Sequence, residues 1–201
     1  MRILEIVEPR ESWAIDFKVV AARVRVAFGA LALRVDHIGS TSVPGLDAKD
    51  IIDIQVTVVS LTPSAPIVQA LARSGVTFRE HLTDDHQPLG DSRAPSGWTK
   101  LVGSTAGRAA ADGQAANVGV NVHVRMAGNP NQRYALLFRD YLRHDAAAAA
   151  TYALIKHELA AIAPGNFDAY YAVKDPVCDL VMAAAERWAQ QTHWSPGPSD
   201  A

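Results

Sequence analysis

Two stretches of the chain alternate strictly between apolar and polar residues, which is the pattern of half-buried β-strands. The first covers residues 51–59 and the second residues 117–125. Their apolar positions are Ile52, Ile54, Val56 and Val58 in the first stretch, and Val118, Val120, Val122 and Val124 in the second. The sequence therefore predicts two strands that each bury one face in a core and turn a polar face away from it.

The remaining elements follow from apolar spacings of three to four residues, which indicate helices, and from short apolar runs between turn residues, which indicate strands. In chain order they are a helix over 13–28, a strand over 33–38, a helix over 63–75, strands over 76–79 and 98–102, a helix after 130, a helix over 152–162 and a helix after Asn166 that Pro176 kinks or restarts. Two long loops, 81–97 and 103–116, separate the later strands. Their length and composition fit lids over a ligand, and disorder fits them equally well.

Strands dominate the first part of the chain and helices the last third, so the predicted fold class is α+β. We expect a single domain over residues 1–194, with an α/β part over about 1–126 and a helical part over about 130–194. The tail, residues 195–201, is rich in Ser, Pro and Gly and is expected to be disordered.

Composition narrows the functional classes. The 201 residues include 19 Lys and Arg against 21 Asp and Glu, a formal net charge of -2, which makes nucleic acid an unlikely partner. Cys178 is the single cysteine, so the chain has neither a disulfide framework nor a Cys-based zinc site. No apolar run approaches roughly 18 residues, and the first residues lack the apolar core of a signal peptide. We therefore expect a cytoplasmic protein that does not enter a membrane.

The polar faces of the two long strands carry side chains that are good metal ligands. Asp53 and Gln55 lie on one strand, and Asn121 and His123 on the other. If the strands are neighbours, these four side chains converge. A carboxylate, an imidazole and two amide oxygens can hold a divalent cation, with water completing the coordination shell. The competing interpretation is a sheet whose outer face is merely polar.

A Gly-Ser turn precedes the first long strand. Gly39 allows a close backbone approach to a ligand, and Ser40, Thr41 and Ser42 offer hydroxyls beside backbone amides, which is the chemistry of a phosphate-binding turn. Lys49 is a candidate cation for the same phosphate. The spacing is not that of a P-loop. An ordinary loop with a solvated lysine is the alternative.

Other polar residues are expected to have structural roles. His37 reads as a half-buried histidine with its hydrogen bonds satisfied, and Arg139 and Asp140 read as a salt-bridged pair on a helix surface. One loop holds a cluster of acidic and histidine side chains without a recognised ligand spacing: His81, Asp84, Asp85 and His86.

The run HIGSTSVPGLDAKDIIDIQV (37–56) resembles the signature of the GrpB family. The resemblance continues in NVHVR (121–125), YALLFRDYLR (134–143) and YYAVKDP (170–176), in the family's order. The chain looks most like the GrpB-like half that is fused to dephospho-CoA kinase in actinobacteria. The resemblance implies the nucleotidyltransferase, or polymerase-β-like, fold: a small mixed sheet with helices packed on it.

The resemblance also implies roles for individual residues. Gly39 and Ser40 match the Gly-Ser turn of that fold, and Asp53 matches the first of its acids and would be the catalytic residue. Gln55 stands in the place of the second acid. Asn121 and His123 stand where a third acid is expected. With one carboxylate in place of three, two hard cations would bind weakly, and the residues leave room for a single ion or for a softer ion that favours the imidazole.

The implied cofactor is Mg²⁺ or Mn²⁺, held by Asp53, Gln55 and His123, and His37, Asn121 and Arg125 are candidate substrate contacts. Two functions are consistent with this reading. The first is a metal-dependent, nucleotidyltransferase-like protein that binds a nucleotide or a phosphorylated small molecule. The alternative is a non-catalytic module that kept the fold, lost the acids, and binds a ligand or a protein partner.

Overall fold

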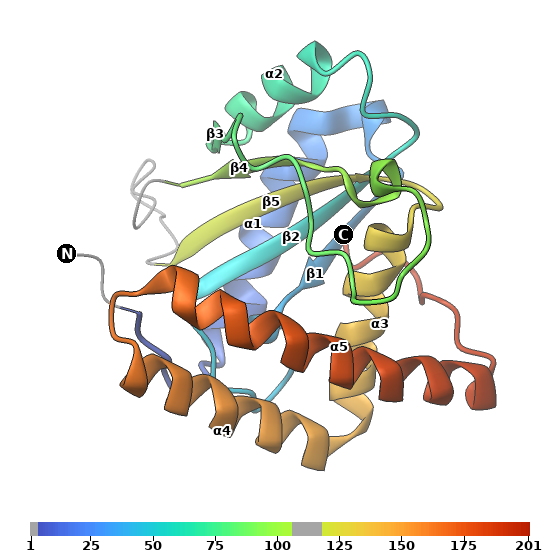
Figure 1. Cartoon of the computed structure of the whole chain (residues 1–201). Helices are drawn as coiled ribbons and strands as arrows, with labels where there is room; N and C mark the ends of the chain where they lie inside the picture. The colour runs from blue at the N-terminus through green and yellow to red at the C-terminus, as the bar shows by residue number, and fades with distance from the viewer. Residues whose placement is uncertain (1–3, 106–117) are drawn as a thin grey trace.

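The computed structural model describes residues 4–105 and 118–201. It shows a five-stranded sheet with five α-helices (Figure 1). In chain order the elements are α1 Ser12–Phe28, β1 Arg34–Ile38, β2 Ile51–Val58, α2 Ala65–Arg73, β3 Thr77–Phe78, β4 Leu101–Ser104, β5 Gly119–Met126, α3 Pro130–His144, α4 Ala146–Ile162 and α5 Phe167–Thr192. Three short 3-10 turns join them: η1 Gly29–Leu31, η2 Ser40–Ser42 and η3 Pro95–Trp98.

The sheet is mixed, with strand order β1-β2-β5-β4-β3. The two long alternating strands, β2 and β5, are parallel neighbours at its centre, and the other pairs are antiparallel. Their register sets Asp53 opposite Asn121 and Gln55 opposite His123. The predicted convergence of the two polar faces therefore depends on a pairing that the structure contains.

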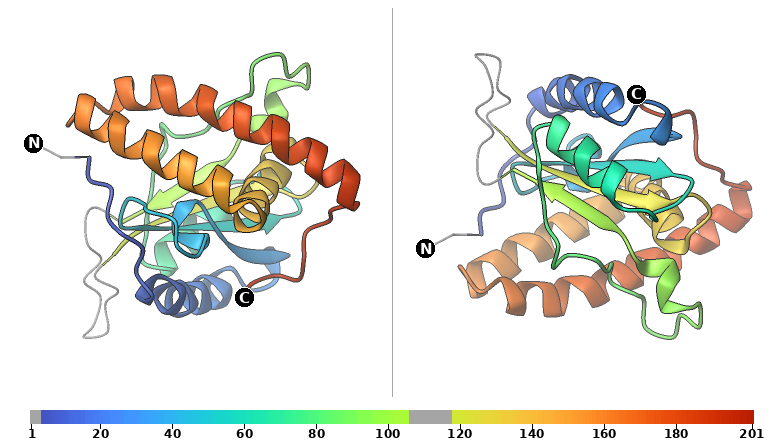
Figure 2. Two further views of the ribbon diagram at one scale, coloured as in Figure 1. Left: turned by 90° about the horizontal axis from the view of Figure 1, so that it is seen from below. Right: turned by 90° about the horizontal axis from the view of Figure 1, so that it is seen from above.

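Helices cover both faces of the sheet. α1 and α2 lie on one face, and α3, α4 and α5 lie on the other, so the sheet is the middle of three layers (Figure 2). The apolar faces of β2 and β5 pack under α1, where Trp13, Phe17 and Val20 are almost wholly buried. A separate apolar cluster joins α3, α4 and α5 to residues 43–46 and includes Leu137, Tyr152 and Met182.

These observations confirm the α+β class, the mixed sheet and the helical last third. α1 begins and ends within a residue of the prediction. α4 begins earlier than predicted, at Ala146, because the alanine run continues the helix and Asp145 caps it by accepting a hydrogen bond from the Ala148 backbone N–H. α5 is one helix with Pro176 inside it, so the helix does not restart at this residue, and the alternative, a kink, stays a prediction.

The predicted strand over 98–102 lies further along the chain. Trp98 closes the turn η3, and the strand β4 starts at Leu101 and takes in Gly103 and Ser104, which the prediction placed in a loop. Antiparallel pairing with β5 extends the strand to these small residues. The rest of the predicted second loop, residues 106–116, lies outside the described part of the chain.

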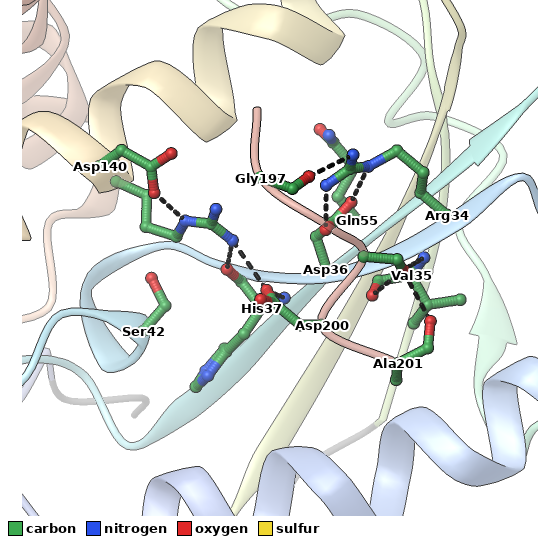
Figure 3. A network of polar contacts seen from close by, with 12 residues as sticks. Arg34, Val35, Asp36, His37, Ser42, Gln55, Asp140, Gly197, Asp200 and Ala201 are labelled. Atoms are coloured by element: carbon green, nitrogen blue, oxygen red, sulfur yellow. Dashed lines mark hydrogen bonds and ion pairs between the residues drawn. The ribbon is translucent and has the colours of Figure 1, made fainter. Parts of the chain in front are cut away.

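Residues 195–201 are not the disordered tail that the composition predicts. Residues 197–201 of this tail lie along the outer edge of β1 (Figure 3). Ser199 Oγ accepts a hydrogen bond from the Val35 backbone N–H at 2.9 Å, and Asp200 Oδ2 accepts one from the His37 backbone N–H at 2.9 Å. The unpaired backbone groups of an edge strand explain why polar tail residues bind there.

In the ranges that the structure describes, no helix is long and apolar enough to cross a membrane.

Candidate functional site

Asp53, Asn121 and His123 meet on the polar face of the central strands. Asn121 Nδ2 donates a hydrogen bond to Asp53 Oδ1 at 2.8 Å, and His123 Nε2 lies 3.4 Å from the same oxygen. The Asp53 side chain keeps 27% of its surface exposed, whereas that of His123 keeps 17%. Three of the four residues predicted to converge therefore do so, around one carboxylate.

Gln55 does not join this group. Its Oε1 accepts a hydrogen bond from Arg125 Nη1 at 2.7 Å, and its Nε2 donates to the Gln132 backbone oxygen at 3.1 Å. The residue is completely buried under α3. Both ends of its amide are thus occupied by protein, which leaves no oxygen for a cation.

Arg125 lies beside the group and is held by the loop before β4. Asp85 pairs with it through two contacts, Nε to Oδ2 at 2.7 Å and Nη2 to Oδ1 at 2.9 Å. Lys100 and Asn131 donate to the same carboxylate. Burial would raise the pKa of Asp85, but the charges of Arg125 and Lys100 outweigh it and hold that pKa well below its ordinary value. Arg125 is therefore a structural cation, and its part in substrate contact stays a prediction.

The loop cluster singled out in the sequence is not assembled into one site. Asp85 faces Arg125, whereas His86 Nε2 lies 2.8 Å from Asp179 Oδ1 on α5. Asp84 forms an isolated bridge with Thr99. The described loop 81–97 is thus tied both to the sheet and to α5.

The Gly-Ser turn packs directly against Asp53. Gly39 has φ +71°, and a Cβ added to it would lie 2.6 Å from Asp53 Oδ2. Any larger residue would be strained and would displace the carboxylate. The group that lies against Gly39 in this structure is Asp53, and the close approach of Gly39 to a ligand stays a prediction.

Lys156 is the main site residue that sequence reasoning missed. It lies on α4 and is only 2% exposed, yet its Nζ donates to Ser40 Oγ at 3.0 Å and to the Asp47 backbone oxygen. Burial, reinforced by the positive charge of Lys174, lowers the pKa of Lys156 to about 7. The sequence contained a signal for this residue, because Lys156 follows Tyr152 by four positions and so lies on the buried stripe of the same helix.

Lys49 lies on the α5 side of the same turn. Its Nζ donates to the Tyr171 hydroxyl at 2.8 Å and stands 4.9 Å and 5.3 Å from the ring centroids of Tyr171 and Tyr170. Its charge also helps to lower the pKa of Asp53. Lys49 precedes β2 and Lys156 lies on α4, so folding brings Lys156 to Ser40 and Lys49 within electrostatic reach of Asp53.

The remaining turn residues point inward. His37 stacks on Phe17 at 4.5 Å between ring centroids, and its Nε2 lies 3.1 Å from Thr41 Oγ1. Thr41 Oγ1 donates to the Ile51 backbone oxygen, and Ser42 Oγ donates to that of Gly39. Thr41 and Ser42 therefore stabilise the turn, while Ser40 is more exposed than either.

Opposing effects set the charges at the centre of the site. Burial alone would raise the pKa of Asp53, but His123, Asn121 and Lys49 outweigh it and hold the pKa below its ordinary value. Burial lowers the pKa of His123, helped by the charges of Lys100 and Arg125. At neutral pH we thus expect an ionised Asp53 beside an uncharged His123. Among the described residues, His123 Nδ1 is buried without a hydrogen-bond partner.

A two-ion centre does not fit these residues. Asp53 is the one carboxylate in the group, and among the described residues no three His, Cys, Asp or Glu side chains gather so that they could hold a metal. A single divalent ion that a ligand also holds fits these residues better. Mg²⁺ is commonly held by one or two carboxylates together with substrate phosphates and water. Both hydrogen bonds to Asp53 end on Oδ1, which leaves Oδ2 for such an ion.

A mixed five-stranded sheet between two helical layers, with a Gly-Ser turn after β1 and an acidic residue on β2, defines a three-layer α+β protein. The chain belongs to the GrpB family, because the GrpB protein family matches residues 3–184. The resemblance read from the sequence is therefore confirmed.

Comparison with individual proteins agrees with this assignment. The chain is 36% identical to a dephospho-CoA kinase of Mycolicibacterium paratuberculosis, over 96% of this chain and 48% of that protein. It thus spans about half the length of this curated relative. The crystal structure of the conserved protein GrpB from Enterococcus faecalis matches with a TM-score of 0.68 and 28% identity, over 92% of this chain and 99% of that one. A weaker similarity, with a TM-score of 0.48 and 15% identity, is to the Cid1 poly(U) polymerase, over 76% of this chain and 43% of that one.

Proposed function

We propose that this chain binds a nucleotide or another phosphorylated small molecule at the Gly39–Ser40 turn. The observation that carries the proposal is the placement of Lys156 Nζ at 3.0 Å from Ser40 Oγ, in a buried position at the turn whose Gly39 packs on Asp53. A buried lysine is costly unless a negative group compensates it. A ligand phosphate bound beside Ser40 would supply that negative charge, and its binding would raise the pKa of Lys156.

We expect the divalent ion to be bound more by the phosphates of the ligand than by the protein. Asp53 would hold one Mg²⁺ or Mn²⁺ that the phosphates also bind, and the ion would neutralise charge on the phosphates. The amide of Asn121 and the imidazole of His123 keep the carboxylate in place through Oδ1. Gln55 has no part in this scheme, because its amide is engaged by Arg125 and Gln132.

Thermal unfolding in the presence of nucleoside triphosphates tests the proposal. A ligand that binds only the folded state raises the melting temperature, by roughly 5 °C or more at concentrations well above its Kd. We expect such a shift with Mg²⁺ or Mn²⁺ present, a smaller one without the ion, and none in Lys156→Met. Asp53→Asn should lose the metal-dependent part alone.

Lys18→Met is the matched control. Lys18 is exposed on α1, on the opposite face of the sheet, and its replacement removes the same charge without touching the site. Each shift is measured against the same variant without ligand, so that a change in intrinsic stability does not enter. An equal shift in wild type, Lys156→Met and Lys18→Met would contradict binding at the turn.

Nucleotidyl transfer is the activity that this site would support. In that reaction an acceptor hydroxyl attacks the α-phosphorus and pyrophosphate leaves, so released pyrophosphate is the readout. The single carboxylate favours the alternative, a non-catalytic module, because the divalent ions of two-metal transfer need more negative charge. A thermal shift without pyrophosphate release would establish the binding module, whereas release that is lost in Asp53→Asn would establish transfer.

A further inference from the structure

The outer edge of β1 is covered by residues 197–201, which we call the strap. Ala201 N donates to the Val35 backbone oxygen at 3.1 Å, and Ser199 Oγ also donates to that oxygen at 3.0 Å. On the same edge, the N–H groups of Val35 and His37 donate to Ser199 and Asp200. Side chains of the strap therefore satisfy backbone groups that a neighbouring strand would otherwise take.

Two arginines bind the strap: Arg34 contacts Gly197 (Figure 3), and Arg139 contacts Asp200. Arg34 is fixed by a two-point contact with the buried Asp36, and its Nη1 donates to the Gly197 backbone oxygen at 2.7 Å. Arg139 Nη1 lies 2.8 Å from Asp200 Oδ2 and 3.0 Å from the His37 backbone oxygen. Arg139 is only 4% exposed, so it is a buried cation and not the surface residue expected from the helical pattern.

His37 connects the strap to the Gly39–Ser40 turn. Its backbone N–H binds Asp200, its backbone oxygen binds Arg139, and its ring contacts Thr41 through Nε2. Because Thr41 Oγ1 donates to the Ile51 oxygen, the proton between the two residues belongs to His37 Nε2. Burial lowers the pKa of His37 to about 4, so the ring is neutral at pH 7 and can carry this single proton on Nε2.

We propose that the strap is a built-in ligand of the β1 edge and that Asp200 is a positioning residue for the Gly39–Ser40 turn. Asp200 fixes His37 from outside the sheet, and His37 fixes Thr41 inside the turn. Release of the strap would loosen the turn without removing any group that faces Asp53. This coupling does not depend on which ligand the turn binds.

Amide hydrogen exchange in the ligand-free full chain tests the proposal. Ser199→Ala combined with Asp200→Ala removes the acceptors of the Val35 and His37 amides, and both should exchange about tenfold faster or more. The amides of Ser42 and Val43, which close the turn onto Gly39 and Ser40, should also exchange faster. Asp140 still pairs with Arg139 in this variant, so the fold retains a counter-ion for that buried cation.

Ser195→Ala is the matched control, because Ser195 lies in the same tail, is exposed and, within the described ranges, forms no hydrogen bond with β1. Its exchange pattern should equal that of the wild type. Unchanged rates at His37 in the double variant would overturn the strap itself. Faster exchange at His37 with unchanged rates at Ser42 and Val43 would overturn its coupling to the turn.

Discussion

At the scale of single residues, the site is built from close contacts between groups of different elements. Gly39 lies against the Asp53 carboxylate, Asn121 and His123 both address one oxygen of that carboxylate, and Lys156 reaches Ser40 from a helix more than a hundred positions away in the chain. Substitutions at these residues should therefore change the free energy of unfolding or its dependence on pH. Each can be compared with a matched control substitution.

A comparison of Gly39→Ala with Gly45→Ala separates the cost of backbone strain from the cost of a steric clash with Asp53. Both glycines have positive φ, +71° and +76°, but an added Cβ meets Asp53 only at Gly39, while nothing lies within 4 Å at Gly45. Gly45→Ala should lower the free energy of unfolding by about 1–2 kcal/mol, the cost of the left-handed backbone. Gly39→Ala should cost clearly more. Equal losses in urea denaturation would show that the turn does not press on Asp53.

Lys156 should make stability depend on pH. Its pKa is about 7 in the folded chain and about 10.4 when unfolded, so between these values the unfolded state binds more protons. The free energy of unfolding should therefore rise with pH above about 7, by up to roughly 1.4 kcal/mol per pH unit. We expect Lys156→Met to remove this rise between pH 7 and 9, and Lys18→Met to keep it. A rise of the same slope in Lys156→Met would contradict the assignment.

At the scale of elements, pattern and pairing account for different parts of the site. Strict alternation in β2 and β5 was enough to predict which side chains share a polar face, and parallel pairing then brought Asp53, Asn121 and His123 together. Alternation could not reveal that Gln55 is covered by α3, because the cover comes from an element 70 or more positions later in the chain.

Loops and tails were the least predictable elements for the same reason. The composition predicted a loop over 81–97, where the structure has irregular backbone up to η3, and a disordered tail over 195–201, which the structure instead ties to β1. Composition does not encode partners such as Arg125 for Asp85 or Arg139 for Asp200. These ion pairs depend on where the sheet and α3 place the two arginines.

The loop 81–97 should stabilise the fold through Asp85. Asp85→Asn would leave Arg125 and Lys100 without their carboxylate in a largely buried position, where unpaired charges typically cost about 3 kcal/mol or more. We expect a loss of this size in the free energy of unfolding, measured in urea. Asp84→Asn, at an exposed neighbour, should change it by less than about 0.5 kcal/mol. Similar effects of the two substitutions would contradict the buried role of Asp85.

At the scale of the whole molecule, the helical last third completes a site that the sheet begins. α4 contributes Lys156, and α5 contributes the tyrosines that hold Lys49. The fold class, the family and the turn could all be predicted from the sequence. The contributions of α4 and α5 to the site could not, because they depend on where these distant helices lie relative to the sheet. The resulting molecule concentrates lysine charge over one carboxylate and one Gly-Ser turn.

Amide NMR during titration with a nucleoside triphosphate and Mg²⁺ tests the central claim most directly, because it reports where the ligand binds. The account predicts that the largest resonance shifts fall on Gly39, Ser40 and Thr41 and at the start of β2 around Asp53, with small shifts on α1 and α2 across the sheet. Shifts of similar size in Lys18→Met and a strong reduction in Lys156→Met would agree with it. The absence of shifts at the turn, or their concentration on α1 and α2, would contradict phosphate binding at Gly39–Ser40.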